Sequence, residues 1–431
     1  RNCYGASGNA SGHSISDNAG AQLQNVGGVP TRLGYCLVEE NLYDHCGWNE
    51  IVDGAGANAL RHNLYFHDLA MPVIYRRNIS YNASANGATF RCGGTVWDNL
   101  QINNPIGLAI YSGFQHNPST VKYNVFTKCG DIRSATLATN GPTTAPSRVV
   151  NFASVPSDVA VGLDVFHAGV PTGAKVASKT ATTVTLDRDT TGNIGNGDTI
   201  YFYGPRGQGI SVNCAGGYGL AATVSSGSNT LTFSETLPDS VTVGQTVAQS
   251  FTGVSSKIPA LTTVSAISAD RRTVTMSANC TATMNSNYQD VILFYTPGVA
   301  LVSPVNVTDN IFTTQMMLRP SQGGECVKLE SLTMGVNVTN NIFYNWLTAV
   351  TDNGLSNNVS GNTSNLSASH VVGGATIEEY DLSIGGPGTA EHFIAGARAQ
   401  SEDNWDSRYT ANAANNYIRA AFGVATVAAM P

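Results

Sequence analysis

The sequence predicts an all-β protein, a right-handed parallel β-helix in which short strands wind into a solenoid. Charged residues make up only 12% of the 431 residues, and glycine occurs 45 times. Lys and Glu usually cover exposed helices, whereas a composition poor in charge and rich in Gly, Thr, Val and Ile suits strands joined by tight turns. Helical spacing of apolar residues begins only near the C-terminus. The strongest observation is an internal repeat.

The repeat places an asparagine in each copy of the pattern apolar-x-x-Asn-x-apolar. The segments VNVTDNIF (305–312) and VNVTNNIF (336–343) start 31 residues apart. The asparagines of the pattern are Asn41, Asn63, Asn78, Asn99, Asn124, Asn310, Asn341 and Asn362. Asparagine tolerates left-handed backbone and suits a bend, so stacked copies predict an asparagine ladder. We expect the apolar residues three before and directly after each asparagine to face the interior.

Two stretches interrupt the repeat and share short motifs, such as IYFY (200–203) and ILFY (292–295). Each predicts a small antiparallel β unit with Pro and Gly turns. Periodicity near the end predicts short helices that cover the open end of the solenoid. The expected segments are N-terminal coils with the candidate site at 1–132, an inserted β module at 133–204, a connecting coil at 205–229, a second inserted β module at 230–296, C-terminal coils at 297–388 and a helical tail at 389–431.

Charge and cysteine content narrow the classes of partner. The formal net charge of -7 does not favour a nucleic-acid partner, and no apolar run is long enough to predict a membrane span. The eight cysteines lack metal-site spacing, which favours buried thiols. A disulfide such as Cys36 with Cys46 stays open.

Ionisable and aromatic residues concentrate in the N-terminal coils, whereas the residues at the same repeat positions of the C-terminal coils are small and, except for Asp309, neutral. A groove of cations, carboxylates and aromatic rings would suit an extended acidic sugar chain, because Arg pairs with carboxylates. The alternative is a solvated outer face. The expected substrate-binding residues are Glu40, Asp53, Arg61, Arg77, Trp97, Tyr111 and Lys122.

At RHNLYFHD (61–68), SANGATFRCGG (84–94) and the NIF-type ladder, the chain resembles the pectate-lyase-like superfamily of right-handed β-helix proteins. The tail QSEDNWDSRYTANAANNYIRAAFG (400–423) is similar to C-terminal tails of bacterial members. The resemblance covers roughly 1–130 and 297–431. It implies a secreted bacterial or phage-virion protein, extracellular or at the cell surface, with a polysaccharide partner, and a homotrimer if the protein is a tailspike. The RxPxxR motif of pectate lyases and a clear Asp cluster for calcium are absent, which argues against a pectate-type mechanism. The sequence identifies no cofactor with certainty, and calcium stays open.

The leading functional hypothesis is a polysaccharide lyase that cleaves an acidic bacterial exopolysaccharide by β-elimination. This reaction needs a neutralised carboxylate, a base and an acid. The expected catalytic residues are Arg91 or Arg76 to neutralise the carboxylate, His62 or His67 as the base, and Tyr65 as the acid. One alternative is a glycoside hydrolase of the tailspike-depolymerase type. Its carboxylate pair would come from Glu40, Asp53, Asp68 and Asp98. The other alternative is a non-catalytic glycan-binding tail or adhesin module.

Overall fold

A computed structural model gives the fold, and the statements below concern the part of the chain that it describes. The described residues are 15–17, 36–46, 48, 57, 61–66, 73–111, 119–171, 173–204, 207–213, 218–249, 256–286, 290–296, 305–314, 324–330, 333–354, 357–367, 372–401 and 403–428.

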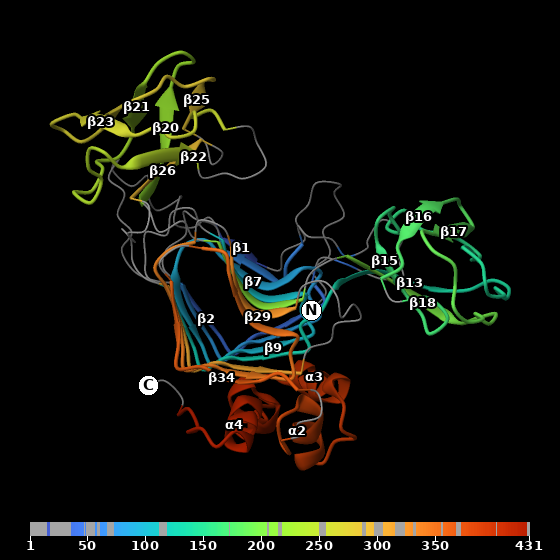
Figure 1. The fold of residues 1–431 in the computed structure, drawn as a ribbon. Coiled ribbons are helices and arrows are strands. Elements are labelled where there is room, and N and C mark those ends of the chain that lie inside the picture. Colours follow the sequence, from blue (N-terminus) through green and yellow to red (C-terminus); the bar gives the residue numbers. More distant parts are fainter. Residues whose placement is uncertain are drawn as a thin grey trace.

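Three seven-stranded parallel sheets form the walls of a solenoid, and each coil adds one strand to each sheet (Figure 1). The first sheet comprises β1 (Ile15–Asp17), β4 (Leu64–Phe66), β7 (Asn86–Phe90), β10 (Ile106–Tyr111), β19 (Gln208–Asn213), β29 (Glu325–Leu329) and β32 (Thr348–Asp352). The second comprises β2 (Cys36–Glu39), β5 (Val73–Arg76), β8 (Gly94–Trp97), β11 (Ser119–Lys122), β27 (Val305–Thr308), β30 (Val336–Thr339) and β33 (Asn358–Ser360). The third comprises β3 (Leu42–Asp44), β6 (Ile79–Tyr81), β9 (Leu100–Ile102), β12 (Val125–Thr127), β28 (Ile311–Thr313), β31 (Ile342–Tyr344) and β34 (Thr363–Asn365). The all-β class and the parallel strands are confirmed, whereas the right-handed winding stays a prediction that follows the usual crossover rule.

Aromatic side chains fill the interior where the first and third sheets meet. Phe126 stacks on Phe312 with ring centroids 4.8 Å apart. Glycines on the first sheet make room for these rings, because a Cβ on Gly107 would lie 2.5 Å from Phe126 and a Cβ on Gly209 would lie 2.5 Å from Phe312. Stacking of like residues on successive coils therefore builds the core.

The asparagine ladder is confirmed, with one member misplaced. Asn78 donates from its backbone N and from Nδ2 to Oδ1 of Asn99, at 2.9 and 3.0 Å. The ladder residues are Asn41, Asn78, Asn99, Asn124, Asn310, Asn341 and Asn362. Asn63 is not among them. The left-handed backbone lies one residue earlier than expected, because Arg77 and Asp98 have φ of 55° and 52° and the asparagines themselves do not.

The residue directly after each ladder asparagine faces outward, which contradicts the expectation. Ile79, Leu100 and Val125 are buried against the helices and not in the solenoid interior. The interior position is the residue three before each asparagine, such as Val96, as expected. The helical elements are α2 (Ile377–Ser383), α3 (Ala390–Ala399), η1 (Ser407–Tyr409) and α4 (Ala411–Ala421). They pack along the outer face of the third sheet and not over the open end, because that face is apolar (Figure 1).

Antiparallel sheets occupy the two stretches that interrupt the repeat. The first insert holds β13 (Ile132–Ala138), β14 (Val149–Asn151), β15 (Asp164–Phe166), β16 (Val176–Lys179), β17 (Thr183–Leu186) and β18 (Thr199–Gly204). The second insert holds β20 (Tyr218–Val224), β21 (Thr230–Phe233), β22 (Thr246–Gln249), β23 (Val264–Ile267), β24 (Thr273–Met276), β25 (Met284–Asn285) and β26 (Val291–Tyr295). The pairing orders β13-β18-β15 and β14-β17-β16 recur as β20-β26-β22 and β21-β24-β23. The two inserts therefore share these two three-stranded pairing orders, and in the second insert β20 also pairs with β21 and β25.

Some boundaries and one cysteine pair differ from the sequence-based expectation. The connecting coil at 205–229 contains β19, a strand of the solenoid, and β20, a strand of the second insert. The helical segment begins at Ile377, before residue 389. Cys36 and Cys46 are both free thiols, so no disulfide joins them.

Candidate functional site

The structure divides the expected site residues between the first sheet with its adjoining corners and the far end of the second sheet's strands. Arg91 directly follows β7 of the first sheet, whereas Trp97 is the last residue of β8 in the second. The group on the first-sheet side is Arg61, His62, Tyr65, Arg91 and Tyr111. The group at the opposite end is Glu40, Arg76, Arg77, Trp97 and Lys122. Three expected residues, Asp53, His67 and Asp68, lie outside the described residues.

The division follows from Asn63. This residue comes just before β4 of the first sheet, and its Oδ1 accepts a hydrogen bond from the backbone N of Cys46. Arg61 and His62 therefore do not share a column with Arg76 and Arg77, as the repeat had suggested. The interval of 37 residues between Asn41 and Asn78 is one complete coil.

On the first-sheet side, three side chains form a cluster that we call the His-Tyr-Arg cluster: His62, Tyr65 and Arg91. The rings of His62 and Tyr65 are stacked, with centroids 5.7 Å apart and planes 12° apart. The guanidinium of Arg91 lies 5.5 Å from the centroid of the Tyr65 ring. A cation over an aromatic face is attracted by the ring quadrupole, so Arg91 holds the tyrosine in place.

Backbone pairing fixes the position of Arg91. Its N–H donates to the carbonyl oxygen of Phe66 at 3.1 Å, and the preceding Phe90 is buried in the core. Since Ile110 pairs with Phe90, the register continues with Tyr111 beside Arg91. Arg91 is half-buried and points away from the core, as the sequence predicted.

A backbone contact sets the tautomer of His62. The N–H of Asn86 donates to His62 Nδ1 at 3.3 Å, and His62 is only 7% exposed. In the neutral ring the proton must then reside on Nε2. In this tautomer Nε2–H is a hydrogen-bond donor and Nδ1 is occupied, so the ring has no free lone pair for the role of base that the sequence-based hypothesis gave it.

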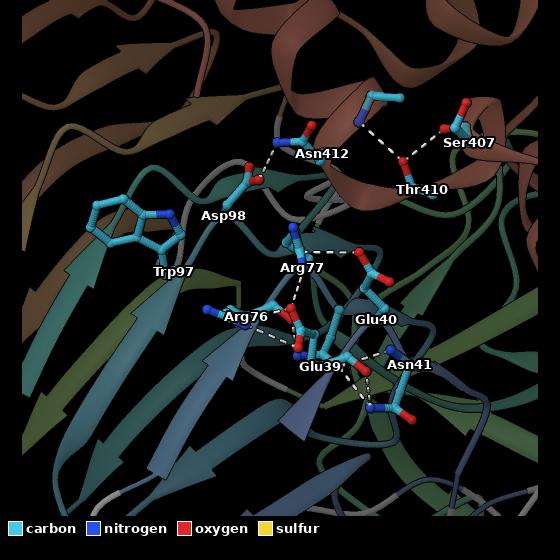
Figure 2. A network of polar contacts seen from close by, with 12 residues as sticks. Glu39, Glu40, Asn41, Arg76, Arg77, Trp97, Asp98, Ser407, Thr410 and Asn412 are labelled. Atoms are coloured by element: carbon cyan, nitrogen blue, oxygen red, sulfur yellow. Dashed lines mark hydrogen bonds and ion pairs between the residues drawn. The ribbon is translucent and has the colours of Figure 1, made fainter. Parts of the chain in front are cut away.

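The group at the far end forms a corner network of Glu39, Glu40, Arg76 and Arg77 (Figure 2). Arg76 donates to both carboxylate oxygens of Glu39, at 2.7 and 3.1 Å. Arg77 also bonds Glu39, and its Nε lies 3.1 Å from Oε1 of Glu40. Partial burial alone would raise the pKa of the Glu39 carboxyl, but the hydrogen bonds from Arg76 and Arg77 outweigh it and lower that pKa. Arg76 is thus committed to Glu39 and lies apart from the His-Tyr-Arg cluster.

Cations and aromatic rings continue along the same edge on the next coils. The Lys122 ammonium lies 5.8 Å from the Trp97 ring centroid and 4.6 Å from that of Tyr123. Arg419 of α4 covers Tyr123 at 4.8 Å. Lys122 also pairs with Asp309 at 3.4 Å. This edge is therefore cross-linked between coils and to the last helix.

Asp98, a candidate hydrolase carboxylate, is buried beneath α4 and is 1% exposed. One oxygen accepts a hydrogen bond from Nδ2 of Asn412 at 2.5 Å (Figure 2). The other accepts from Nδ2 of Asn415 at 2.9 Å. Burial raises the pKa of Asp98 to about 6, although these bonds and the charges of Arg419 and Arg77 act to lower it. A carboxyl covered in this way cannot reach a glycosidic bond, so its role is in holding the helix.

A pocket that sequence reasoning missed lies between the corner network and the helices, and we call it the helix-side pocket. Its volume is about 410 Å³. The lining residues are Glu40, Asn41, Leu42, Asp44, Arg77, Ile79, Ala397, Arg398, Gln400, Ser401, Trp405, Tyr409, Thr410 and Ala411. The wall that carries Trp405 comes from the C-terminal tail, more than three hundred residues from Glu40, so only the fold brings them together.

The described residues contain no group of three or more His, Cys, Asp and Glu side chains that could hold a metal ion. Within the same part of the chain, every helix is too short or too polar to cross a bilayer.

No protein-family model matches the chain. No curated protein matches it. Among solved structures, the tailspike protein gp49 from Pseudomonas phage LKA1 is similar with a TM-score of 0.17 and 11% sequence identity, over 67% of this chain. The chain spans 37% of that tailspike chain.

Proposed function

We propose that this protein binds an acidic bacterial polysaccharide outside the cell and cleaves it by β-elimination at the His-Tyr-Arg cluster. The observation that carries the proposal is that the Tyr65 ring contacts both the His62 ring and the guanidinium of Arg91. Elimination next to a uronic-acid carboxylate requires a cation beside a group that can take up a proton and return it. The protein would be secreted by a bacterium or carried on a phage virion. It would form a homotrimer if it is a tailspike.

Each residue of the cluster has a role in this proposal. Arg91 pairs with the substrate carboxylate and stabilises the negative charge that develops on it. In its deprotonated form Tyr65 removes the C5 proton, while Nε2–H of His62 donates a hydrogen bond to O4. Tyr65 then returns the proton to O4 as the C4–O4 bond breaks and a C4=C5 double bond forms, so the proton lost by C5 is gained by the leaving group.

Local charge supports an anionic substrate in spite of the overall balance. The chain has 22 Lys and Arg against 29 Asp and Glu. Arg91 nevertheless places a positive charge beside Tyr65 in this acidic protein. A guanidinium in this position attracts a carboxylate group of a polyanion at low and moderate salt.

The pairing and burial of the candidate carboxylates favour a lyase over a hydrolase. Among the described hydrolase candidates, Glu40 pairs with Arg77 and Asp98 is buried. Neither is placed to act as a free acid or nucleophile.

The test is incubation with a panel of uronic-acid-containing bacterial exopolysaccharides, following viscosity and the ultraviolet absorbance of the new C=C bond. We expect the absorbance to increase with time for the wild type. For Arg91→Ala the rate of this increase should be about a hundredfold lower or more. Arg148→Ala, which alters an exposed arginine of the first insert, is the matched control. New reducing ends without absorbance would indicate a hydrolase, and binding without either product would indicate a glycan-binding module. Either result overturns the proposal.

A further inference from the structure

The helix-side pocket has the features of a ligand site separate from the His-Tyr-Arg cluster. Its volume of about 410 Å³ falls in the usual range for small-molecule sites, roughly 300–1,000 Å³. Its two walls come from different parts of the fold, with Glu40 and Asp44 on the solenoid and Arg398 and Trp405 on the helical tail. Figure 2 shows the solenoid wall, where Arg77 extends between Glu39 and Glu40 and faces the segment that carries Thr410.

The charges in the pocket cancel in pairs. Arg77 pairs with Glu40 at 3.1 Å, and Arg398 pairs with Asp44. An anionic ligand would compete with the two carboxylates, and a cationic ligand would compete with the two guanidiniums. A neutral ligand avoids both penalties, and it meets carboxylate acceptors next to guanidinium donors. Adjacent hydroxyl groups, which both donate and accept, match this alternation.

An aromatic platform stands at the rim. Trp405 is 50% exposed, which is unusual for so large an apolar ring. Its loop is held in place by Gln400, whose Oε1 accepts from the N–H of Asp406 at 2.9 Å and whose Nε2 donates to the carbonyl of Tyr409 at 2.9 Å. The loop is therefore fixed although the indole is exposed, as expected for a surface that stacks on a ligand.

The tyrosine on the same loop is positioned by a glycine. A Cβ on Gly396 of α3 would lie 2.2 Å from the Tyr409 ring, so the ring rests directly on the helix backbone. This close contact sets one wall of the pocket beside Ala397.

We propose that the helix-side pocket binds a neutral sugar ring, which stacks on Trp405 while its hydroxyl groups bond to Glu40, Asp44, Arg77 and Arg398. The inference rests on the proposed function for the source of the sugar, since a neutral unit of the same polysaccharide would occupy the pocket. The pocket would tether the chain and would leave bond cleavage to the cluster around Arg91.

The experiment is saturation-transfer NMR with tryptophan fluorescence, on the full chain, using neutral probes: glucose, galactose, mannose, rhamnose, fucose, N-acetylglucosamine and N-acetylgalactosamine, with glucuronic and galacturonic acids for comparison. We expect at least one neutral sugar to bind at millimolar concentration and to bind more tightly than either uronic acid. Trp405→Ala and Glu40→Gln should each weaken binding about tenfold or more.

Two matched controls separate this site from the rest of the protein. Phe166→Ala removes an aromatic ring of similar exposure, 40%, from the first insert and should leave sugar binding unchanged. Arg91→Ala should abolish cleavage and keep sugar binding, so that failure of the proposed function can be told from failure of this inference. Absence of binding by every neutral probe, preference for the uronic acids, or equal binding by Trp405→Ala and the wild type would overturn the inference. Melting curves confirm that each variant is folded.

Discussion

Asn415 of α4 donates a hydrogen bond of 2.9 Å to the carboxylate of Asp98, and both side chains are buried. Asp98 belongs to the corner just before a ladder asparagine, and Asn415 belongs to the last helix. The bond therefore couples the packing of the helical tail to the protonation state of one carboxyl group in the solenoid.

The first prediction concerns this carboxyl. Its pKa of about 6 in the folded state lies above the ordinary value of 3.8, so the folded protein holds the proton more tightly than the unfolded chain. The stabilisation from protonation is complete below about pH 4 and is lost as the pH rises through about 6. Its size is about 3 kcal/mol, from 1.36 kcal/mol for each unit of pKa. The free energy of unfolding of the wild type, relative to that of Asp98→Asn, should therefore increase between pH 7 and pH 4.

Urea denaturation across this pH range checks the prediction. Asparagine is tolerated at the positive φ of this position. Asp309→Asn is the matched control, because Asp309 has a similar φ of 56° on another coil but is partly exposed. Parallel pH curves for the wild type and Asp98→Asn would contradict the assignment.

The second prediction concerns the ladder. Asn310→Leu and Asn341→Leu should each lower the free energy of unfolding by about 1–3 kcal/mol, because buried backbone partners lose their hydrogen bonds. The side chain of Asn310, for example, accepts two hydrogen bonds from Asn124 and donates to two backbone carbonyl oxygens. Asn358→Leu, at an exposed asparagine of the second sheet, should have little effect. Equal melting temperatures for all three variants would mean that the ladder does not stabilise the fold.

The third prediction concerns the glycines beside the stacked rings. Gly107→Ala should destabilise by about 1–3 kcal/mol, since the new methyl group would lie 2.5 Å from Phe126 and 2.8 Å from the carbonyl oxygen of Gly209. Gly373→Ala has open space around it and serves as the control. Thermal unfolding of both variants is the measurement, and a Gly107→Ala protein as stable as the wild type would show that the core relaxes freely there.

The fourth prediction concerns the inserts. Ile132 pairs with Gly204, and Tyr218 pairs with Phe294, so each insert leaves and rejoins the solenoid at neighbouring residues. Replacing 134–202 or 219–293 with a short Gly-Ser linker should leave a folded solenoid. A single deletion of 150–296 should fail, because it also removes β19 from the first sheet. Circular dichroism and solubility check both outcomes, and a folded 150–296 deletion would contradict the topology.

The repeat in the sequence was sufficient to predict most of the fold. Near-identical copies around Asn310 and Asn341 sufficed to predict parallel coils and a buried ladder. The misplacement of Asn63 had a physical origin, since an asparagine before an apolar strand also suits the corner that leads into the first sheet. One-dimensional spacing cannot tell one corner from another unless the length of each coil is known.

The candidate site was harder to predict because its parts come from distant segments. The position of the Arg91 guanidinium over the Tyr65 ring, on which His62 stacks, depends on the pairing of β4 with β7. No local sequence pattern specifies this pairing. The outward orientation of Ile79 and Leu100 depends on the helices that cover them. Those helices also supply the partners of Asp98 and one wall of the helix-side pocket.

The ladder bond between Asn124 and Asn310 spans 186 residues, whereas the next bond, from Asn310 to Asn341, spans 31. Closing the longer loop costs about 1.6 kcal/mol more in chain entropy if the intervening chain is unstructured. The inserts remove much of this penalty once they have folded, because each brings its own ends together. We therefore expect the solenoid to form from two nuclei, the coils before β13 and the coils after β26. Folding kinetics would then be limited by their joining, and removal of the inserts would accelerate it.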